Sequence, residues 1–147
     1  MKYLIALIML VSFNTFAGDV IVGFKSYHFD RKAEFNETNP TIGYDFDNGL
    51  GVLYTQKNSI ERKTVMATYR YQYFDSKYLS SDVRVGVASG YPDKAKYNGD
   101  YTYHQHFGSG NFRAIASLDF NIKTSKAVKT LITINPAYIG LGFKIKL

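Results

Sequence analysis

The sequence predicts an all-β fold, an eight-stranded antiparallel up-and-down transmembrane β-barrel, from three observations. Residues 138–147 alternate without a break, and one face carries Ile139, Leu141, Phe143, Ile145 and Leu147. A period of two is the period of a β-strand. The same alternation recurs along the chain, and residues 1–17 have the pattern of a secretion signal. An exported chain of such strands is typical of a barrel that is apolar outside and polar inside.

The N-terminal segment predicts export. Lys2 precedes an apolar run at 3–13, and the small residues Thr15 and Ala17 stand at positions −3 and −1 of a cleavage site after Ala17. A membrane-spanning helix needs about 20 apolar residues, more than this run provides. We expect a signal peptide at 1–17 and an outer-membrane β-barrel domain at 18–147, located in the outer membrane of a Gram-negative bacterium. The sequence contains no cysteine, so no disulfide is expected.

Eight segments of alternating hydrophobicity, bounded by turn residues, predict the strands. An even number suits a single-chain barrel. No segment after residue 17 is apolar enough to cross a bilayer as a helix, so membrane insertion must use strands that pair around a closed ring. The segments lie at 19–29, 39–46, 50–57, 63–74, 80–88, 111–122, 127–134 and 138–147.

The predicted connections differ in length at the two ends of the barrel. Short links follow the second, fourth and sixth strands, and the first of these, Asp47-Asn48-Gly49, is a hairpin-turn sequence. The longer connections span 30–38, 58–62 and 89–110. Because outer-membrane barrels have short periplasmic turns and longer outer loops, we expect these three connections on the outer side.

Strand parity separates an apolar outward face from a polar inward face. Apart from Arg113, the charged inward residues lie in the periplasmic halves of the strands: Asp45, Arg70, Asp82, Arg84, Asp119, Lys144 and Lys146. We expect buried Arg–Asp pairs there, because an unpaired buried charge is costly. The outer halves place small or apolar residues inward, which predicts a slot for one hydrocarbon chain. The alternative is that Tyr138 or the 89–110 loop fills this space.

His28, Asn58 and Ser59 are the residues best placed for chemistry. His28 lies at the outer end of the first strand, and Asn58 and Ser59 lie at the outer end of the third, so all three share one rim. A histidine base beside a serine hydroxyl is the minimal arrangement for acyl transfer. Nearby cations, including Arg31 and Arg62, suit a surface of phosphorylated glycolipid.

This rim resembles that of the lipid A palmitoyltransferase family over about residues 24–75. The similar segments are His28-Phe29-Asp30, Phe35-Asn36-Glu37-Thr38-Asn39-Pro40-Thr41-Ile42-Gly43, Gly51-Val52-Leu53-Tyr54 and Lys57-Asn58-Ser59. The resemblance implies an eight-stranded outer-membrane barrel whose apolar interior holds a phospholipid acyl chain and passes it to lipid A. By position, it implies that His28 and Ser59 are catalytic and that Asn58 stands in the place of an aspartate. Asn58 lacks that negative charge but can orient an imidazole by a hydrogen bond or donate to an oxyanion.

We expect the acyl chain to contact the upper lumen and the rim. Proline cannot donate to a strand ladder, so Pro40 and Pro136 mark places where a lateral gap can admit a lipid tail, unless they are ordinary loop boundaries. The candidate lipid-binding residues are Pro40, Gly43, Met66, Ala88, Ile115, Leu131, Pro136, Gly140, Arg31 and Arg62.

Two other classes of function remain open. The first is a non-catalytic outer-membrane barrel whose loops bind a surface partner or mask a receptor, mainly through the 89–110 loop and its tyrosines. The second is a soluble lipocalin-like periplasmic carrier, which requires the opposite polarity of the two faces. His104 and His106 lack further metal ligands at a suitable spacing, so we expect a solvated loop and no metal.

The charge pattern limits the classes of binding partner that we expect. The chain has a net charge of +6 and a pI of about 9.4, but its cations are scattered over strand ends and lumen positions. Nucleic-acid binding needs a concentrated basic face, so we expect none. We expect a monomer without a cofactor, whose partners are membrane lipids, lipopolysaccharide and the outer-membrane insertion machinery.

Overall fold

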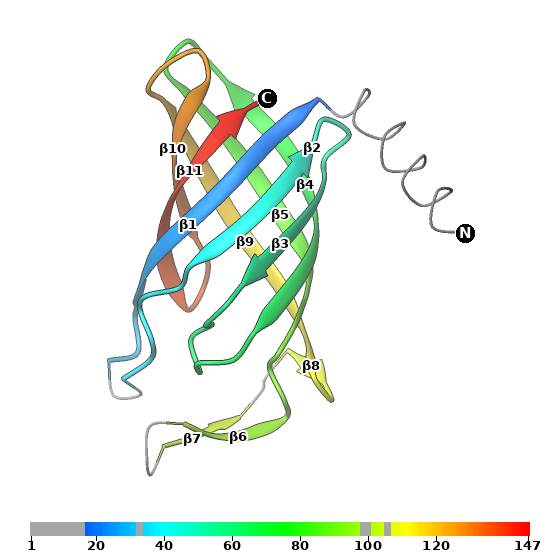
Figure 1. Ribbon diagram of the computed structural model, residues 1–147, viewed down its shortest axis with the longest axis vertical. Helices are drawn as coiled ribbons and strands as arrows, with labels where there is room; N and C mark the ends of the chain where they lie inside the picture. Colours follow the sequence, from blue (N-terminus) through cyan, green and yellow to red (C-terminus); the bar gives the residue numbers. More distant parts are fainter. Residues whose placement is uncertain (1–16, 32–33, 98–100, 105–106) are drawn as a thin grey trace, which may run out of the picture.

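The computed structural model shows a closed, eight-stranded antiparallel β-barrel (Figure 1). It describes residues 17–31, 34–97, 101–104 and 107–147, so the expected signal peptide at 1–17 lies almost wholly outside the described residues. The strands are β1 (Gly18–His28), β2 (Thr41–Phe46), β3 (Leu50–Thr55), β4 (Thr64–Asp75), β5 (Leu79–Ser89), β6 (Lys94–Tyr97), β7 (Tyr101–His104), β8 (Gly108–Ser109), β9 (Phe112–Lys123), β10 (Val128–Ile134) and β11 (Tyr138–Lys146).

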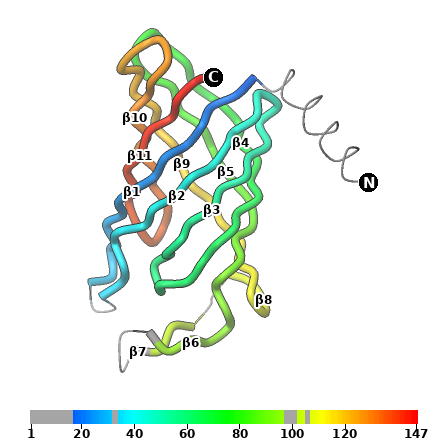
Figure 2. The backbone as a smooth tube through the Cα atoms, viewed as in Figure 1, coloured from blue at the N-terminus to red at the C-terminus, as the bar shows by residue number. Residues whose placement is uncertain are grey.

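The barrel strands pair in chain order, and the pairing of β1 with β11 closes the ring. Each of the predicted segments corresponds to one barrel strand, so the sequence-based fold class is confirmed. Figure 2 shows neighbouring strands running side by side, with β1 beside β11. The turn between β2 and β3 is tight because Gly49 adopts φ +90°, a left-handed conformation that glycine tolerates.

The short turns and the C-terminus lie at one end of the barrel, and the long connections lie at the other (Figure 1). We call the first the turn end and the second the loop end. β1 and β4 each contain a bulge, where Phe24 and Tyr73 lack a partner in the register. The bulge in β4 places two neighbouring aromatic side chains, Tyr73 and Phe74, on the exposed surface.

The outward face of the barrel is apolar, as strand parity predicts. Exposed large side chains on the barrel wall include Ile42, Val52, Val65, Tyr69, Tyr71, Val83, Val85, Val87, Leu118, Leu141, Phe143 and Ile145. A soluble protein rarely exposes so continuous an apolar surface. None of the described residues forms a helix that is long and apolar enough to cross a membrane.

The interior of the turn-end half is filled by a buried ionic cluster. Arg84 donates two hydrogen bonds to Asp45, at 2.8 and 2.7 Å, and its Nε donates to Asp119 at 2.8 Å. Lys144 Nζ lies 3.1 Å from Asp45 and 3.4 Å from Asp82, and Arg70 also approaches both carboxylates. The expected buried Arg–Asp pairs are present. They close this half of the lumen, as expected for a barrel whose interior is just filled by side chains.

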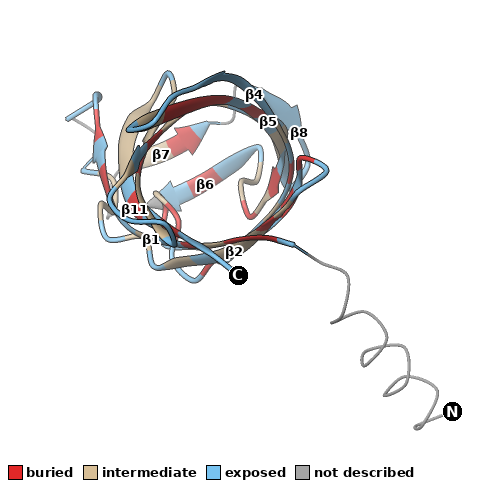
Figure 3. Cartoon of the chain, turned by 90° about the horizontal axis from the view of Figure 1, so that it is seen from above, coloured by how far each residue is buried: buried red, intermediate tan, exposed pale blue. Residues whose placement is uncertain are grey.

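Above the ionic cluster lies a small apolar layer. Ile21, Leu53 and Leu131 pack together there, with Met66 against them. Seen along its axis, the barrel is a ring of strands with buried stretches in its wall (Figure 3). This layer lies between the charged turn-end half and the loop-end half.

The described residues of the 89–110 connection include three short strands. Strands β6 and β7 form a hairpin, and β8 pairs with the start of β9. Figure 3 shows the hairpin lying across the end of the ring. It docks there because Ala95 and Tyr103 bury themselves against Ile60 of the 58–62 turn, with Phe35 and Tyr91 packed on this group. The apolar residues of the connection account for this docking.

Candidate active site

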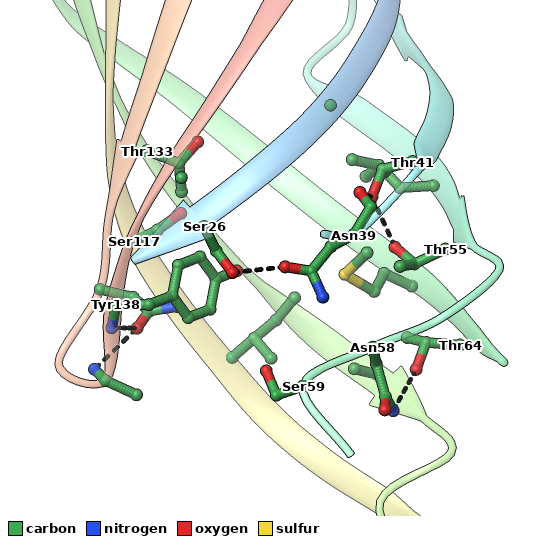
Figure 4. Close-up of a pocket in the computed structure, with 18 of the residues that line it drawn as sticks. Ser26, Asn39, Thr41, Thr55, Asn58, Ser59, Thr64, Ser117, Thr133 and Tyr138 are labelled. Atoms are coloured by element: carbon green, nitrogen blue, oxygen red, sulfur yellow. Dashed lines mark hydrogen bonds between the residues drawn. The ribbon is translucent and has the colours of Figure 1, made fainter. Parts of the chain in front are cut away.

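The loop-end half of the barrel contains a mainly apolar cavity of about 590 Å³. Its floor is formed by Ile21, Leu53 and Leu131, with Arg84 and Asp119 of the ionic cluster also bordering it, and its walls include Met66 and Ala88. Ligand sites in proteins have volumes of this order and are lined mostly by apolar groups with a few polar ones. Figure 4 shows the polar residues that lie around this cavity, among them Ser59 and Tyr138.

His28 and Ser59 meet at the cavity. The imidazole Nε2 of His28 lies 2.8 Å from the hydroxyl Oγ of Ser59, although 31 positions separate them in the chain. β1 brings His28 to the loop end, and the turn after β3 brings Ser59 to the same place. This is the distance at which a general base accepts a proton from a serine hydroxyl.

The ring of His28 is held by packing. The rings of Phe35 and Tyr138 lie on it, with centroids 5.0 and 5.4 Å away. Its backbone N–H donates to the carboxylate of Glu37 at 3.2 Å. The imidazole Nδ1 is buried and has no hydrogen-bond partner among the described residues. In this part of the chain, the pair is therefore a dyad without a carboxylate behind the histidine.

Residues 34–40 form a strap that fixes both members of the dyad. The backbone N–H of Asn36 donates to the carbonyl of Ser59 at 3.0 Å, and its side chain donates to the carbonyl of Asn58 at 3.2 Å. On the β1 side, Ser26 donates from its backbone to the carbonyl of Glu37 and from its hydroxyl to the Asn39 side chain (Figure 4). The Asn-Glu segment that carried the family resemblance thus acts as a positioning element.

Asn58 does not contact the imidazole. Its side-chain oxygen accepts from the backbone N–H groups of Ile60 and Arg62, at 2.9 and 3.0 Å. Its amide nitrogen donates to the Thr64 hydroxyl at 2.9 Å (Figure 4) and to the Gly90 carbonyl at 3.1 Å. These four hydrogen bonds shape the 58–62 turn that carries Ser59, so the expectation that Asn58 orients the imidazole is not what the structure shows.

Tyr91 is a further polar group beside Ser59, and the sequence predicted it only as one of the tyrosines of a partner-binding loop. Its phenol lies close enough to Ser59 for the hydrogen-bonding groups of Ser59 to act against the rise of the Tyr91 pKa. Burial raises the pKa of Tyr91, although the positive charge of Arg113 acts against this shift. The phenol therefore keeps its proton and can donate. A tyrosine just after a strand carries no signal in a single sequence that distinguishes this position from its neighbours.

The candidate lipid-binding residues divide into two groups. The first group lines the cavity and comprises Met66, Ala88, Ile115, Leu131, Pro136 and Gly140. The second group does not line it: Gly43 is pressed against Leu53 in the wall, Arg31 is paired with Glu37, and Pro40 and Arg62 lie outside the lining. His104 lines the cavity, but among the described residues no cluster of metal-ligating side chains is found. His106 lies outside the described residues.

The barrel wall is incomplete beside Pro136. The pairing of β9 with β10 ends at Leu118, and β8 covers β9 only around Arg113. Between them, the described strands pair residues 115–117 with β5 alone. The outward-facing Ala114 and Ala116 line the same cavity as the inward-facing Ile115, so the cavity reaches the outer surface of the barrel here.

Comparisons with known proteins return little. No family model and no curated protein sequence matches the chain. Among solved structures, the outer membrane protein Ail of Yersinia pestis, determined as a backbone structure in a phospholipid bilayer nanodisc, is similar with a TM-score of 0.46 and 11% identity. The similarity covers 90% of this chain and 99% of that one.

Proposed function

We propose that this protein is an outer-membrane acyltransferase that moves an acyl chain from a phospholipid to lipid A or a related glycolipid. The observation that carries the proposal is the 2.8 Å contact between His28 Nε2 and Ser59 Oγ beside an apolar cavity. The similarity of the rim to the lipid A palmitoyltransferase family supports the same activity. No cofactor is needed for such a transfer.

The outward face supports the location. A closed barrel with an apolar exterior and a buried ionic interior is suited to lipid outside and not to water. The loop end then faces the cell exterior, where lipid A lies. The dyad therefore sits at the level of the outer leaflet, and the turn end faces the periplasm.

The chemistry follows from the two side chains. Ser59 Oγ attacks the ester carbonyl carbon of the donor while His28 Nε2 takes the hydroxyl proton. The intermediate collapses to an acyl ester on Ser59, and His28 returns the proton to the departing glycerol oxygen, which leaves as a lysophospholipid. A glycolipid hydroxyl then attacks the acyl ester, with His28 again accepting and Ser59 regaining the proton. The protonated phenol of Tyr91, beside Ser59, donates to the developing oxyanion.

The cavity and the wall opening supply the route. An acyl chain enters between β9 and the Pro136 turn and lies in the cavity above Ile21 and Leu131. The ester remains at the mouth beside Ser59. The exposed cations of the rim, including Arg62, face the phosphorylated head of the acceptor.

The test measures the mass of lipid A by mass spectrometry in cells that produce the wild-type protein or a variant. Each protein is first shown to be inserted in the outer membrane. The wild-type chain should add the mass of one fatty acyl group, and S59A and H28A should add none. S117A is the matched control, because Ser117 lines the same cavity without touching His28. An unchanged lipid A mass with the folded wild-type protein would contradict the proposal.

The competing function is a non-catalytic barrel that binds a partner through its loops. Its strongest feature is the 89–110 connection, but Tyr91 and Tyr103 pack into the barrel mouth instead of projecting from it. Deletion of the β6–β7 hairpin separates the two functions. A surface-binding barrel loses its activity on deletion and keeps it in H28A, whereas an acyltransferase loses activity in H28A.

A further inference from the structure

Arg113 is an unusual cation in the loop-end half of the barrel. It is the inward charged residue of β9 in this half, and it lines the apolar cavity. It lies close enough to His28, Tyr91 and Tyr138 to interact electrostatically with each. The positive charge is therefore within electrostatic range of the dyad and lines the same cavity.

Arg113 is half-buried, and it has few of the partners that an interior guanidinium needs. Its Cζ lies 5.0 Å from the centroid of the Tyr91 ring, and its Nη1 reaches the Tyr103 hydroxyl at a long 3.5 Å. Its Nε is buried and finds no hydrogen-bond partner in the part of the chain that the structure describes. Among the described residues, no carboxylate forms an ion pair with it.

Arg84 of the same barrel is an interior arginine whose guanidinium is fully paired with carboxylates. Its nitrogens bond to Asp45 at 2.7 and 2.8 Å and to Asp119 at 2.8 Å. An unpaired charge at an apolar site is costly, so Arg113 is a position where an anionic ligand gains more than it does on an exposed surface. Stacking on Tyr91 uses one face of the guanidinium and leaves N–H groups at its edge available.

The planar fork of an arginine fits the oxygens of a phosphate group. In a glycerophospholipid, only the glycerol backbone separates the phosphodiester from the acyl ester. Tyr91 contacts both Ser59 and Arg113, so a donor whose ester carbonyl lies at Ser59 brings its phosphodiester toward Arg113.

We propose that Arg113 is a phosphate subsite that recognises the phosphodiester of the phospholipid donor, beside the His28–Ser59 dyad. This inference rests on the proposed function, because the donor's ester is placed at Ser59. Under this inference, the Arg113 guanidinium contributes to the selection of the donor lipid together with the apolar cavity. A neutral diacylglycerol with the same acyl chains should fill the cavity without using this subsite.

The test is lipid binding, measured by native mass spectrometry of the purified protein in neutral detergent. The probes are phosphatidylglycerol and diacylglycerol with identical acyl chains. The wild-type protein should prefer phosphatidylglycerol, and R113Q should lose about tenfold or more of that affinity while binding of diacylglycerol is unchanged. K123Q is the control, because Lys123 is a cation that pairs with Asp75 at the turn end. It should keep the preference.

R113K keeps the proposal testable if R113Q does not fold, because lysine retains the charge without the fork. It should show a reduced preference for phosphatidylglycerol. Equal binding of the two lipids by the wild-type protein, or equal losses for both lipids in R113Q, would overturn the subsite. Inorganic phosphate that displaces phosphatidylglycerol at matched concentration would assign the site to a free ion and overturn the headgroup assignment.

The binding test is independent of acyl transfer. S59A should retain the preference for phosphatidylglycerol, because Ser59 is not part of the subsite. A preference that depends on Arg113, together with an unchanged lipid A mass, would leave the subsite standing and reject the proposed transfer. The reverse result would reject the subsite and keep the transfer.

Discussion

Asn58 and Gly90 are joined by a hydrogen bond, although 32 positions separate them in the chain. The side-chain amide of Asn58 donates to the Gly90 carbonyl at 3.1 Å, and Gly90 has a φ of +79°. The same amide donates to the Thr64 hydroxyl. The turn that carries Ser59 is thereby fixed to the start of the 89–110 connection. Asn58 therefore has a structural role here that needs an N–H donor.

N58D should therefore destabilise the protein and should not activate it. A carboxylate can still accept from the backbone N–H groups of Ile60 and Arg62, but it cannot donate to the Gly90 carbonyl. A carboxylate oxygen and the Gly90 carbonyl oxygen then lie opposite each other without a hydrogen bond. We expect a loss of about 1–3 kcal/mol in the free energy of unfolding. Urea unfolding in lipid vesicles, followed by circular dichroism, measures it.

N48D is the matched control for this substitution. The Asn48 side chain accepts from the backbone N–H of Leu50 in the β2–β3 turn, and a carboxylate can do the same. We expect a change below about 0.5 kcal/mol. A stable N58D with raised acyl transfer would show that the position serves the imidazole and not the turn.

R84M should be the most destabilising single change in the turn-end half. Arg84 joins Asp45 to Asp119, and both carboxylates are buried, so its removal leaves negative charge uncompensated. Breaking a buried pair from one side costs about 3–5 kcal/mol. The control is K123M, which removes a partly exposed partner of Asp75 and should cost less than about 1 kcal/mol. Equal losses in the two variants would contradict a special role for the buried cluster.

The strands were predictable from the sequence because their register has a simple cause. One face of every strand meets the apolar exterior and the other meets the lumen, so residues such as Val83, Val85 and Val87 alternate with Asp82, Arg84 and Gly86. The rim position of His28 and Ser59 follows from strand order alone. Their 2.8 Å contact confirms that the two side chains meet, and it leaves their proposed catalytic role to experiment.

The contacts of the connections were not predictable in the same way. The role of Asn58 depends on where Gly90 lies, and that depends on how the β6–β7 hairpin docks on Ile60. Strand parity carries no information about such long-range loop contacts. The two bulges, at Phe24 and Tyr73, also escape a strict period of two, because each inserts one residue without a turn signal.

The strap that holds the dyad should weaken in acid. Burial alone would raise the pKa of Glu37, but the hydrogen bond from the His28 backbone and the Arg31 guanidinium outweigh it and lower that pKa. A carboxyl group with a lowered folded pKa stabilises the fold above its ordinary pKa of 4.5 and loses this effect as the pH falls through the folded value. E37Q should thus be less stable than wild type at pH 7, and the difference should shrink below pH 4.5.

Thermal unfolding of the two proteins across this pH range measures the difference. E61Q is the control, because Glu61 lies in the neighbouring turn and no ion pair involving its side chain is found among the described residues. Its difference from wild type should stay small and flat with pH. A wild-type advantage over E37Q that persists at low pH would mean that Glu37 does not act through its charge.

L131A should lengthen the acyl chain that the barrel holds. Leu131 lies in the floor of the cavity with Ile21 and Leu53, directly above the ionic cluster, so a shorter side chain deepens the cavity. The same change costs about 2–5 kcal/mol in stability, because it removes buried apolar contacts. Native mass spectrometry of copurified lipids should show a shift to longer chains. L118A is the control, since Leu118 faces outward and does not line the cavity. An unchanged chain distribution in L131A, with the protein folded, would show that the floor of the cavity does not limit the chain.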